Sequence, residues 1–198
     1  MKLNDIRDVA VIGSGVIGYS WALSFAMNGH KVHVYDVKDD ALKLAKSRIH
    51  DSLENLASNK VLNPNKIEKI ESRISYTTSI ENAVKNTKFI VESGPEKYEV
   101  KWSIVNDVEK YASAKQPERF IGAHPYNPPH LIPLVEITKG EKTKDENVQL
   151  AYDLYKSIKK EPVILQKEAL GFICNRIQMA VYREVSDSVM RAVCSIED

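Results

Sequence analysis

Six residues near the N-terminus constrain the fold of this chain more than any other feature. Gly13-Ser14-Gly15-Val16-Ile17-Gly18 directly follows the apolar run Val9-Ala10-Val11-Ile12, and an apolar stretch from Tyr19 to Met27 comes after it. The run is typical of a strand buried on both faces, and the stretch after the glycines is typical of a helix. With a second strand at Lys31–Asp36, these segments predict one βαβ unit.

The glycines in this turn predict a dinucleotide-binding site. Gly13 permits the tight turn, Gly15 lets the backbone approach a pyrophosphate, and Gly18 lets the helix pack close to the sheet. The N–H groups at the start of the helix, where Val16 and Ile17 lie, would meet the phosphate charge. Asp36 ends the second strand, and a carboxylate there accepts hydrogen bonds from ribose hydroxyls and repels a 2′-phosphate. The sequence therefore predicts NAD as the cofactor, rather than NADP.

The remaining pattern predicts a Rossmann-type, doubly wound α/β fold with a mostly parallel sheet. Two helices over about 39–71 interrupt the alternation and are expected to project from the sheet. Further strands are expected at 73–77, 88–92, 120–123, 134–137 and 162–165, the last at an edge, with helices at 96–114 and 144–159. A long amphipathic helix from Leu170 to Val193 has an apolar stripe that no remaining sheet would cover. We therefore predict an NAD-binding domain over 1–167 and the beginning of an all-helical substrate and dimerisation domain over 168–198.

Composition excludes several classes of function. The formal net charge is +1 with 28% charged residues, which gives no field to attract nucleic acid or an anionic membrane. No apolar run is long enough for a spanning helix, and no signal-peptide pattern begins the chain. Cys174 and Cys194 have neither metal nor redox spacing and are interpreted as small apolar helix residues. The sequence therefore predicts a cytoplasmic protein without a metal site.

The segment that carries chemistry lies in the second half, around His124. A single histidine at a strand end is more often structural than catalytic. Glu136 closes the next strand, and neighbouring strands would bring it against the imidazole. A carboxylate partner fixes the tautomer of a histidine and raises its basicity, so this pair indicates a general base. His130 has no such partner and is interpreted as a loop histidine.

At this point the chain resembles the L-3-hydroxyacyl-CoA dehydrogenase family. The match is carried by the glycine turn, by Val91-Glu92 leading to Glu96 and Lys101, by His124-x-x-Asn127-Pro128, by Leu134-Val135-Glu136 and by Gly171-Phe172-Ile173-x-Asn175-Arg176. The resemblance implies that His124 takes the proton from a substrate 3-hydroxyl. It also implies that Glu136 orients the His124 ring and favours its charged form, and that Asn175 polarises the developing carbonyl. It also places Glu96 and Lys101 along the nicotinamide half of NAD, and it implies a homodimer formed through the C-terminal helical region.

The chain departs from that family in two places. The family carries a further strand, ending in a serine that binds the substrate hydroxyl, between the helix of Lys101 and the strand of His124. Here Tyr111 to Arg119 runs directly into Phe120, and Ser113 has no assigned role. The family also continues beyond the helix of Asn175, whereas this sequence stops at Asp198. Losing an interior strand would open a gap in the sheet that a fold would not easily tolerate. We therefore expect, from the abrupt junction near Ala114–Lys115, that the 198 residues omit parts of a longer protein.

Three functions stay open from the sequence. The first is an NAD-dependent dehydrogenase acting on an L-3-hydroxyacyl-CoA or on a small free 3-hydroxy acid such as carnitine or gulonate. The mixed charge of the helices over 39–71 does not decide between these substrate classes. The second is a non-catalytic NAD-binding member of the family, as some lens crystallins are. The third is an unrelated Rossmann enzyme of the decarboxylating hydroxy-acid class, which would need a catalytic lysine where Asn175 stands.

Overall fold

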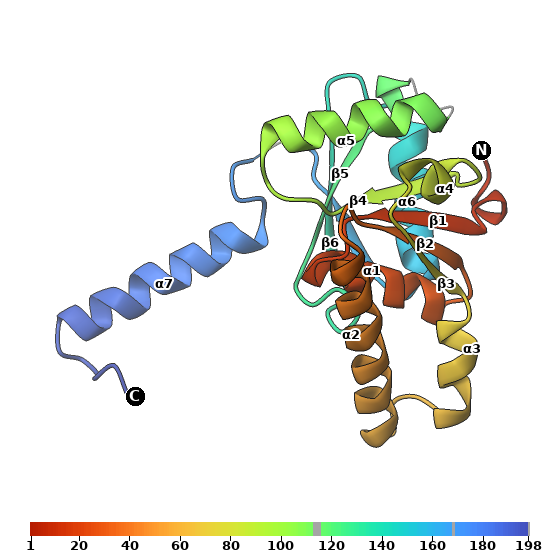
Figure 1. Cartoon of the computed structure of the whole chain (residues 1–198). Helices are drawn as coiled ribbons and strands as arrows, with labels where there is room; N and C mark the ends of the chain where they lie inside the picture. The colour runs from red at the N-terminus through yellow and green to blue at the C-terminus, as the bar shows by residue number, and fades with distance from the viewer. Residues whose placement is uncertain (113–115, 168, 198) are drawn as a thin grey trace.

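The structure, a computed structural model, describes residues 1–112, 116–167 and 169–197 of the chain (Figure 1). Its strands form two sheets, one four-stranded and parallel, the other three-stranded and mixed. The strands are β1 (Asp8–Ile12), β2 (Lys31–Tyr35), β3 (Ile74–Thr77), β4 (Phe89–Glu92), β5 (Ile121–Pro125), β6 (Leu134–Lys139) and β7 (Glu161–Ile164). The α-helices are α1 (Val16–Met27), α2 (Asp39–Ser58), α3 (Ile67–Glu71), α4 (Ile80–Val84), α5 (Tyr98–Tyr111), α6 (Asp145–Ser157) and α7 (Cys174–Met190).

The four-stranded sheet has the order β3-β2-β1-β4 and is covered on both faces. Val9 and Val11 of β1 face the core beneath α1, while Ala10 and Ile12 pack on the opposite side with residues of α4 and α5. This alternation explains why β1 reads as a continuous apolar run, because both of its faces are buried. The predicted doubly wound α/β class is confirmed. The pair α2 and α3 projects beyond the sheet, as expected (Figure 1).

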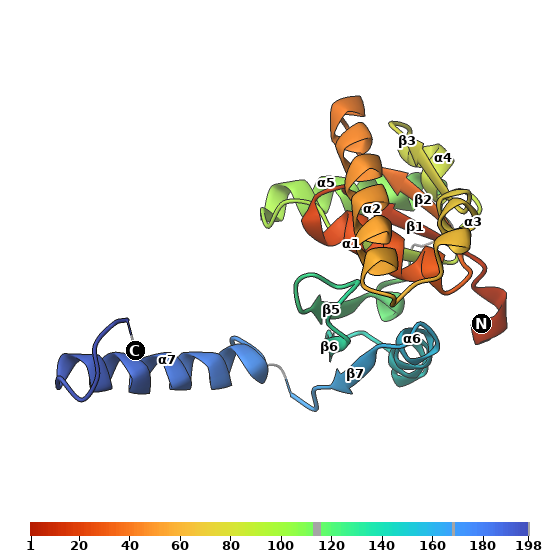
Figure 2. The same ribbon diagram turned by 90° about the horizontal axis from the view of Figure 1, so that it is seen from below.

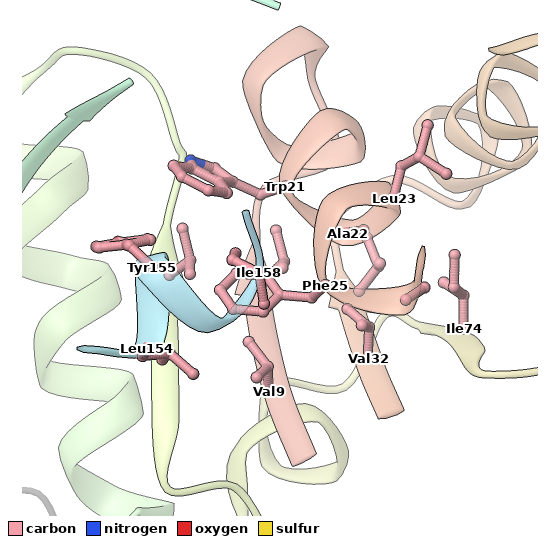
Figure 3. Packing of buried hydrophobic residues seen from close by; sticks show 14 of the residues in the cluster. Val9, Trp21, Ala22, Leu23, Phe25, Val32, Ile74, Leu154, Tyr155 and Ile158 are labelled. Carbon is pink, nitrogen blue, oxygen red and sulfur yellow. The ribbon is translucent and has the colours of Figure 1, made fainter. Parts of the chain in front are cut away.

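The three-stranded sheet has the order β5-β6-β7, with β5 antiparallel to β6 and β6 parallel to β7. Helix α6 packs on one face of it and joins the core of the first sheet through aromatic rings (Figure 3). The ring of Tyr155 on α6 lies 5.3 Å from that of Trp21 on α1 and 6.1 Å from that of Phe89 on β4, measured between centroids. Aromatic rings of α1, β4 and α6 therefore pack together between the two sheets. Strand β7 is an edge strand, as predicted.

Two helices differ from the sequence prediction. Helix α4 was not expected, since it has only five residues and too few apolar positions to show a period; the Ser79 side chain, which accepts from the Asn82 N–H, caps its start. Helix α5 begins at Tyr98 instead of Glu96, because Lys97 keeps an extended backbone, with φ −129° and ψ 124°. Its predicted last residues, the junction at Ala114–Lys115 and Ser113 lie outside the described residues.

Helix α7 is shorter than predicted and lies apart from the two sheets (Figures 1 and 2). The predicted helix from Leu170 is wrong at its start because Gly171 and Phe172 have positive φ angles, 78° and 50°, which a right-handed helix excludes. It is also wrong at its end, where Ala192 has φ 54°. No residue of α7 is buried, so its apolar stripe is exposed. The division into domains at residue 168 stays a prediction.

Candidate active site

The turn between β1 and α1 has the geometry that its glycines predict. Gly13 has φ 97°, and a Cβ atom there would lie 2.6 Å from the Ser93 carbonyl oxygen. A Cβ on Gly18 would collide with the Gly13 carbonyl, so the helix can approach the turn only without a side chain. Gly15 is different, because a Cβ there would meet nothing within 4 Å. It therefore leaves open space at the start of α1, next to Val16 and Ile17, where helix N–H groups lack intrahelical partners.

Asp36 follows β2 and closes this turn from the side. Its Oδ2 accepts hydrogen bonds from the backbone N–H of Ser14, at 2.9 Å, and from the Ser14 hydroxyl, at 2.8 Å. Its Oδ1 accepts from the Lys38 N–H at 3.2 Å. The structure thus places Asp36 beside the glycine turn, as the sequence predicted. Ser14 is a partner that the sequence did not single out, although its place between two motif glycines could have suggested it.

A lysine and two glutamates lie beyond the end of β4. Lys101 Nζ is 2.7 Å from Glu92 Oε2 and 3.2 Å from Glu96 Oε2, and the Gly94 N–H donates to Glu92 Oε1 at 2.6 Å. Burial lowers the pKa of Lys101, but its bonds to the two carboxylates outweigh burial and leave that pKa above its usual value. Lys101 is therefore a fixed cation at the carboxyl edge of the parallel sheet. Glu96 and Lys101, which were expected at this edge, form an ion pair, and Glu92 forms a second one with the same lysine.

His124 and Glu136 are brought together by strand pairing. His124 on β5 is the register partner of Glu136 on β6 in the antiparallel pair. Directly paired residues of antiparallel strands project from the same face of the sheet, with Cβ atoms about 5 Å apart. The His124 ring contacts the rings of Tyr126 and Phe172, with centroids 5.7 Å and 5.3 Å away. The face opposite α6 thus holds a histidine, a carboxylate and two aromatic rings.

Glu136 has a second role that the sequence did not suggest. It is 1% exposed, and its Oε1 accepts from the N–H groups of Ile173, at 2.8 Å, and Cys174, at 3.1 Å. These bonds fix the beginning of α7. Its Oε2 has no hydrogen-bond partner among the described residues. One oxygen of this buried carboxylate is therefore left to accept a hydrogen bond from another group, since a buried acceptor normally has a partner.

Asn175 reaches the same face from the first turn of α7. Its Oδ1 accepts from the Tyr126 hydroxyl at 3.4 Å, a long hydrogen bond. Burial, a hydrogen bond with the Cys174 thiol and the charge of Glu136 raise the pKa of Tyr126, so its hydroxyl stays a donor. Tyr126 was not among the predicted site residues. Its place two residues after His124, on the same strand face, is the signal that could have found it.

The loop between β5 and β6 is pinned to the cofactor helix. The His130 Nδ1 atom lies 3.0 Å from the hydroxyl of Ser20, a buried residue of α1. Lys160 is only 5% exposed and donates to the carbonyls of Pro129 and Ile132. Burial lowers the pKa of Lys160 to about 8. Burial and then the charge of Lys160 also lower the pKa of His130. His130 is therefore a structural loop residue, as interpreted, but one that links the two halves of the site.

These residues fit a bound dinucleotide. The open space at Gly15, the start of α1 and the carboxylate of Asp36 form one continuous edge, and Ser93, whose hydroxyl is buried without a partner among the described residues, adjoins Gly13. A ligand with hydroxyl and phosphate groups would satisfy such atoms. Among the described residues no group of three or more His, Cys, Asp or Glu side chains is placed to hold a metal ion. No helix in the described ranges is long and apolar enough to cross a membrane.

Comparison with known sequences then decides the family. The sequence profile of the 3-hydroxyacyl-CoA dehydrogenase NAD-binding domain matches residues 8–116 and 111–169. This chain belongs to the 3-hydroxyacyl-CoA dehydrogenase family. It is 32% identical to L-carnitine dehydrogenase of Oceanobacillus iheyensis over 213 residues, covering 98% of this chain and 68% of the relative. It is also 32% identical to a 3-hydroxyacyl-CoA dehydrogenase of Gibberella moniliformis, covering 98% of this chain and 65% of the relative.

Solved structures of this family have the same fold. The crystal structure of (S)-3-hydroxybutyryl-CoA dehydrogenase from Ralstonia eutropha superposes with a TM-score of 0.89 at 25% identity, covering 97% of this chain and 74% of that one. The 3-hydroxybutyryl-CoA dehydrogenase of Escherichia coli gives a TM-score of 0.87 at 29% identity, covering 96% and 44%. NAD binding is the property that defines the matched domain, so the predicted cofactor is confirmed.

The comparisons also bear on the expectation that residues are omitted near Ala114–Lys115. The chain spans about two thirds of the length of the curated relatives that it matches. Alignments of 213 and 218 positions exceed its 198 residues, so these relatives carry residues with no counterpart here. The two stretches that match the family profile meet at residues 111–116, between α5 and β5. The junction lies between β4, the last strand of the four-stranded sheet, and β5, the first strand of the three-stranded sheet.

Proposed function

We propose that this dehydrogenase-family chain oxidises the 3-hydroxyl of a hydroxy acid to a ketone, with His124 as the general base. The observation that carries the proposal is the direct pairing of His124 with Glu136 on the sheet face to which α7 brings Asn175. Relatives named for 3-hydroxyacyl-CoA and L-carnitine oxidation support the reaction class, because each of those substrates carries a hydroxyl at C3. We extend the proposal to both substrate classes, an acyl-CoA and a small free 3-hydroxy acid.

In this proposal each residue acts on one atom of the substrate. The His124 imidazole takes the hydroxyl proton, and the free oxygen of the Glu136 carboxylate stabilises the imidazolium that forms. The amide of Asn175, which can donate as well as accept, polarises the oxygen that becomes a carbonyl. The glycine turn and Asp36 would hold NAD, which would supply the acceptor for the hydride that leaves C3. Lys101, held by Glu92 and Glu96, keeps a positive charge at the edge of the sheet where the cofactor would lie.

A second candidate is favoured by a specific observation. His124 lies on β5, an end strand of the three-stranded sheet, and the curated relatives carry residues that have no counterpart in this chain. A chain that lacks those residues beside the substrate site would bind NAD through Gly13, Gly15 and Gly18 but would bind the substrate weakly. This candidate is a non-catalytic NAD-binding member of the family. Turnover separates the two, because only the first candidate reduces NAD.

The test is NAD reduction followed by absorbance, with 3-hydroxybutyryl-CoA, carnitine and gulonate as substrates. His124→Ala should lower the rate by about 10²–10⁴-fold while leaving NAD affinity unchanged, since general-base catalysis contributes that much. His50→Ala is the matched control, because His50 is an exposed α2 histidine paired with Glu71 on α3. Normal NAD binding without turnover on any of the three substrates would support the non-catalytic candidate. Equal turnover in the His124→Ala variant and the wild type would remove His124 from the mechanism.

The homodimer predicted from the sequence also stays part of this proposal. Ile177, Val181 and Val185 follow one another along α7 at helical spacing and are more than half exposed. An apolar stripe of this size fits a further helical surface, and the C-terminal helical region of a second copy would supply one.

A further inference from the structure

The pairing of β5 with β6 fixes His124 against Glu136, but it does not fix either residue relative to the glycine turn. The two residues belong to the three-stranded sheet, whereas the turn follows a strand of the four-stranded sheet. Hydride transfer requires one arrangement of base, substrate and cofactor, and a displacement of about 1 Å can lower the rate about 10²-fold. Contacts that place the β5–β6 loop, residues 126–133, relative to α1 therefore bear on catalysis.

His130 attaches this loop to α1. Its Nδ1 atom lies 3.0 Å from the hydroxyl of Ser20, and its ring centroid is 6.1 Å from that of Tyr19. Both partners lie about one turn after Val16, where α1 begins beside the glycine turn. Because Ser20 is fully buried within that helix, it gives the loop a fixed point close to the cofactor site.

Lys160 makes a second attachment, from the residue before β7. It donates to the carbonyls of Pro129 and Ile132 in the same loop. Its Nζ atom also lies 5.8 Å from the ring centroid of Trp21, which follows Ser20 in α1. Hydrogen bonds are directional, so two bonds from one ammonium group fix the loop backbone more narrowly than apolar packing does. Both attachments therefore reach the same turn of α1.

A buried ammonium group is a costly way to hold a loop. The printed hydrogen-bond partners of Lys160 are carbonyls, which carry no compensating charge. Apolar residues of similar volume often stabilise a fold as well as buried charges or better. The two bonds from Lys160 thus point to a requirement on the geometry of the loop rather than on stability alone.

We propose that His130 and Lys160 are positioning residues for the dehydrogenase reaction. They hold the loop between β5 and β6 against α1, and they thereby keep His124 at a fixed place relative to the cofactor site. Because it takes His124 as the base, this inference rests on the proposed function. Loss of either attachment should slow the chemical step without weakening NAD binding at the glycine turn.

The first test separates kcat from KM. His130→Ala and Ser20→Ala remove opposite sides of one contact, and each should lower kcat about 10–100-fold while KM and NADH affinity change less than about twofold. Combining them should cost no more than either alone. His130→Asn should restore most of the rate, because its amide can still bond with Ser20. Lys160→Met should behave like His130→Ala.

His33→Ala is the matched control. The His33 Nδ1 atom lies 2.8 Å from the hydroxyl of Ser75, so this variant removes the same kind of bond between β2 and β3. Its kcat should equal that of the wild type. A fall in kcat that His33→Ala shares, or that His130→Asn does not reverse, would mean a general loss of stability and would overturn the inference.

The second test needs no turnover. The N–H groups of Leu131 and Ile132 bond with the Pro128 carbonyl in the loop, and their hydrogen exchange reports its opening. Saturating NADH should slow both amides about tenfold in the wild type, since the loop is attached to the helix that binds the cofactor. In His130→Ala the two amides should not respond to NADH, whereas in His33→Ala they should respond as in the wild type.

The two tests together distinguish this inference from the proposed function. A wild type that oxidises a substrate, with unchanged kcat in His130→Ala and Lys160→Met, would overturn the inference and leave the proposed function standing. A wild type without turnover, whose loop still responds to NADH only when His130 is present, would refute the proposed function and support the attachment. Loop amides that ignore NADH in the wild type would overturn the inference.

Discussion

The two halves of the site are built by different means. The cofactor half, at the turn after β1, depends on backbone alone: missing side chains at Gly13 and Gly18 create its shape. The proposed catalytic half, on β5 and β6, depends on side chains that register brings together, and one of them, Glu136, keeps an oxygen without a partner among the described residues. The first half lies over strands buried on both faces, whereas the second lies beside an unpaired strand edge and an exposed helix (Figure 2).

The two halves therefore differ in how far the sequence alone reveals them. A turn defined by backbone must be built from glycine, so its pattern is visible in the sequence. A site defined by side chains across two strands depends on register, which a sequence specifies only through its hydrophobic pattern. The cofactor half should therefore lose stability or NAD affinity when a side-chain carbon is added to one of its glycines. The catalytic half should respond to changes in charge and in hydrogen bonding.

The largest effect is expected at Gly18. Gly18→Val should lower the free energy of unfolding by about 3 kcal/mol, because its Cβ would overlap the Gly13 carbonyl and force the helix away from the turn. Gly15→Ala is the matched control, with open space around the added methyl and an extended backbone. It should change stability by less than about 1 kcal/mol while weakening NAD binding. Urea unfolding and NADH fluorescence measure the two quantities, and equal losses of stability in both variants would contradict this account of the turn.

The next effect concerns Lys160, which links the halves. Its pKa in the folded chain, about 8, lies below the ordinary lysine value of 10.5, because burial disfavours the charge. The unfolded chain then binds more protons between pH 8 and 10.5, so stability should rise with pH in that window. From pH 8 to 9.5, below the titration of the tyrosines, the free energy of unfolding of the wild type should gain about 1.5–2 kcal/mol relative to Lys160→Met.

The control for this pH dependence is Lys156→Met. Lys156 pairs with Glu161, and that bond raises its pKa, so its contribution is lost only above the ordinary lysine range. Its unfolding curve should follow the wild type between pH 8 and 9.5. Urea titrations at half-unit steps of pH give the slopes. A flat difference between wild type and Lys160→Met would mean that Lys160 is not held in an apolar environment.

Much of the fold could be read from the sequence because periodicity reports burial. An apolar pattern shows how much of an element is buried, and so where it lies in the fold. This holds for β1, for the projecting helix α2 and for the edge strand β7. The beginning of α7 could not be predicted, since it depends on the Glu136 carboxylate, a contact between residues nearly forty positions apart. Tyr126 and Lys160 were missed for the same reason. Their partners are backbone and side-chain atoms that only the folded chain brings together.

A smaller effect is expected at Asp36, on the side of the cofactor half. Asp36→Asn keeps an oxygen that can accept from Ser14, so the turn should stay intact. It removes the charge that repels a 2′-phosphate and that strengthens bonds from ribose hydroxyls. NAD affinity should fall about tenfold, or about 1.4 kcal/mol, and the preference for NAD over NADP should narrow. Titrating NADH and NADPH against the variant and against Asp39→Asn, an exposed α2 control, measures this. An unchanged preference for NAD over NADP would mean that Asp36 does not determine which cofactor binds.

The smallest effect is expected where the catalytic half meets α7. The Tyr126 hydroxyl and Asn175 Oδ1 are 3.4 Å apart, near the limit for a hydrogen bond, and the raised pKa of Tyr126 keeps the proton on its hydroxyl. A double-mutant cycle with Tyr126→Phe and Asn175→Ala should therefore give a coupling energy of only about 0.5–1 kcal/mol. Glu136, with two shorter bonds to the start of α7, would then be the main attachment of the helix. A coupling of about 2 kcal/mol or more would reverse that order, and it would mean that the catalytic half is as tightly constrained as the glycine turn.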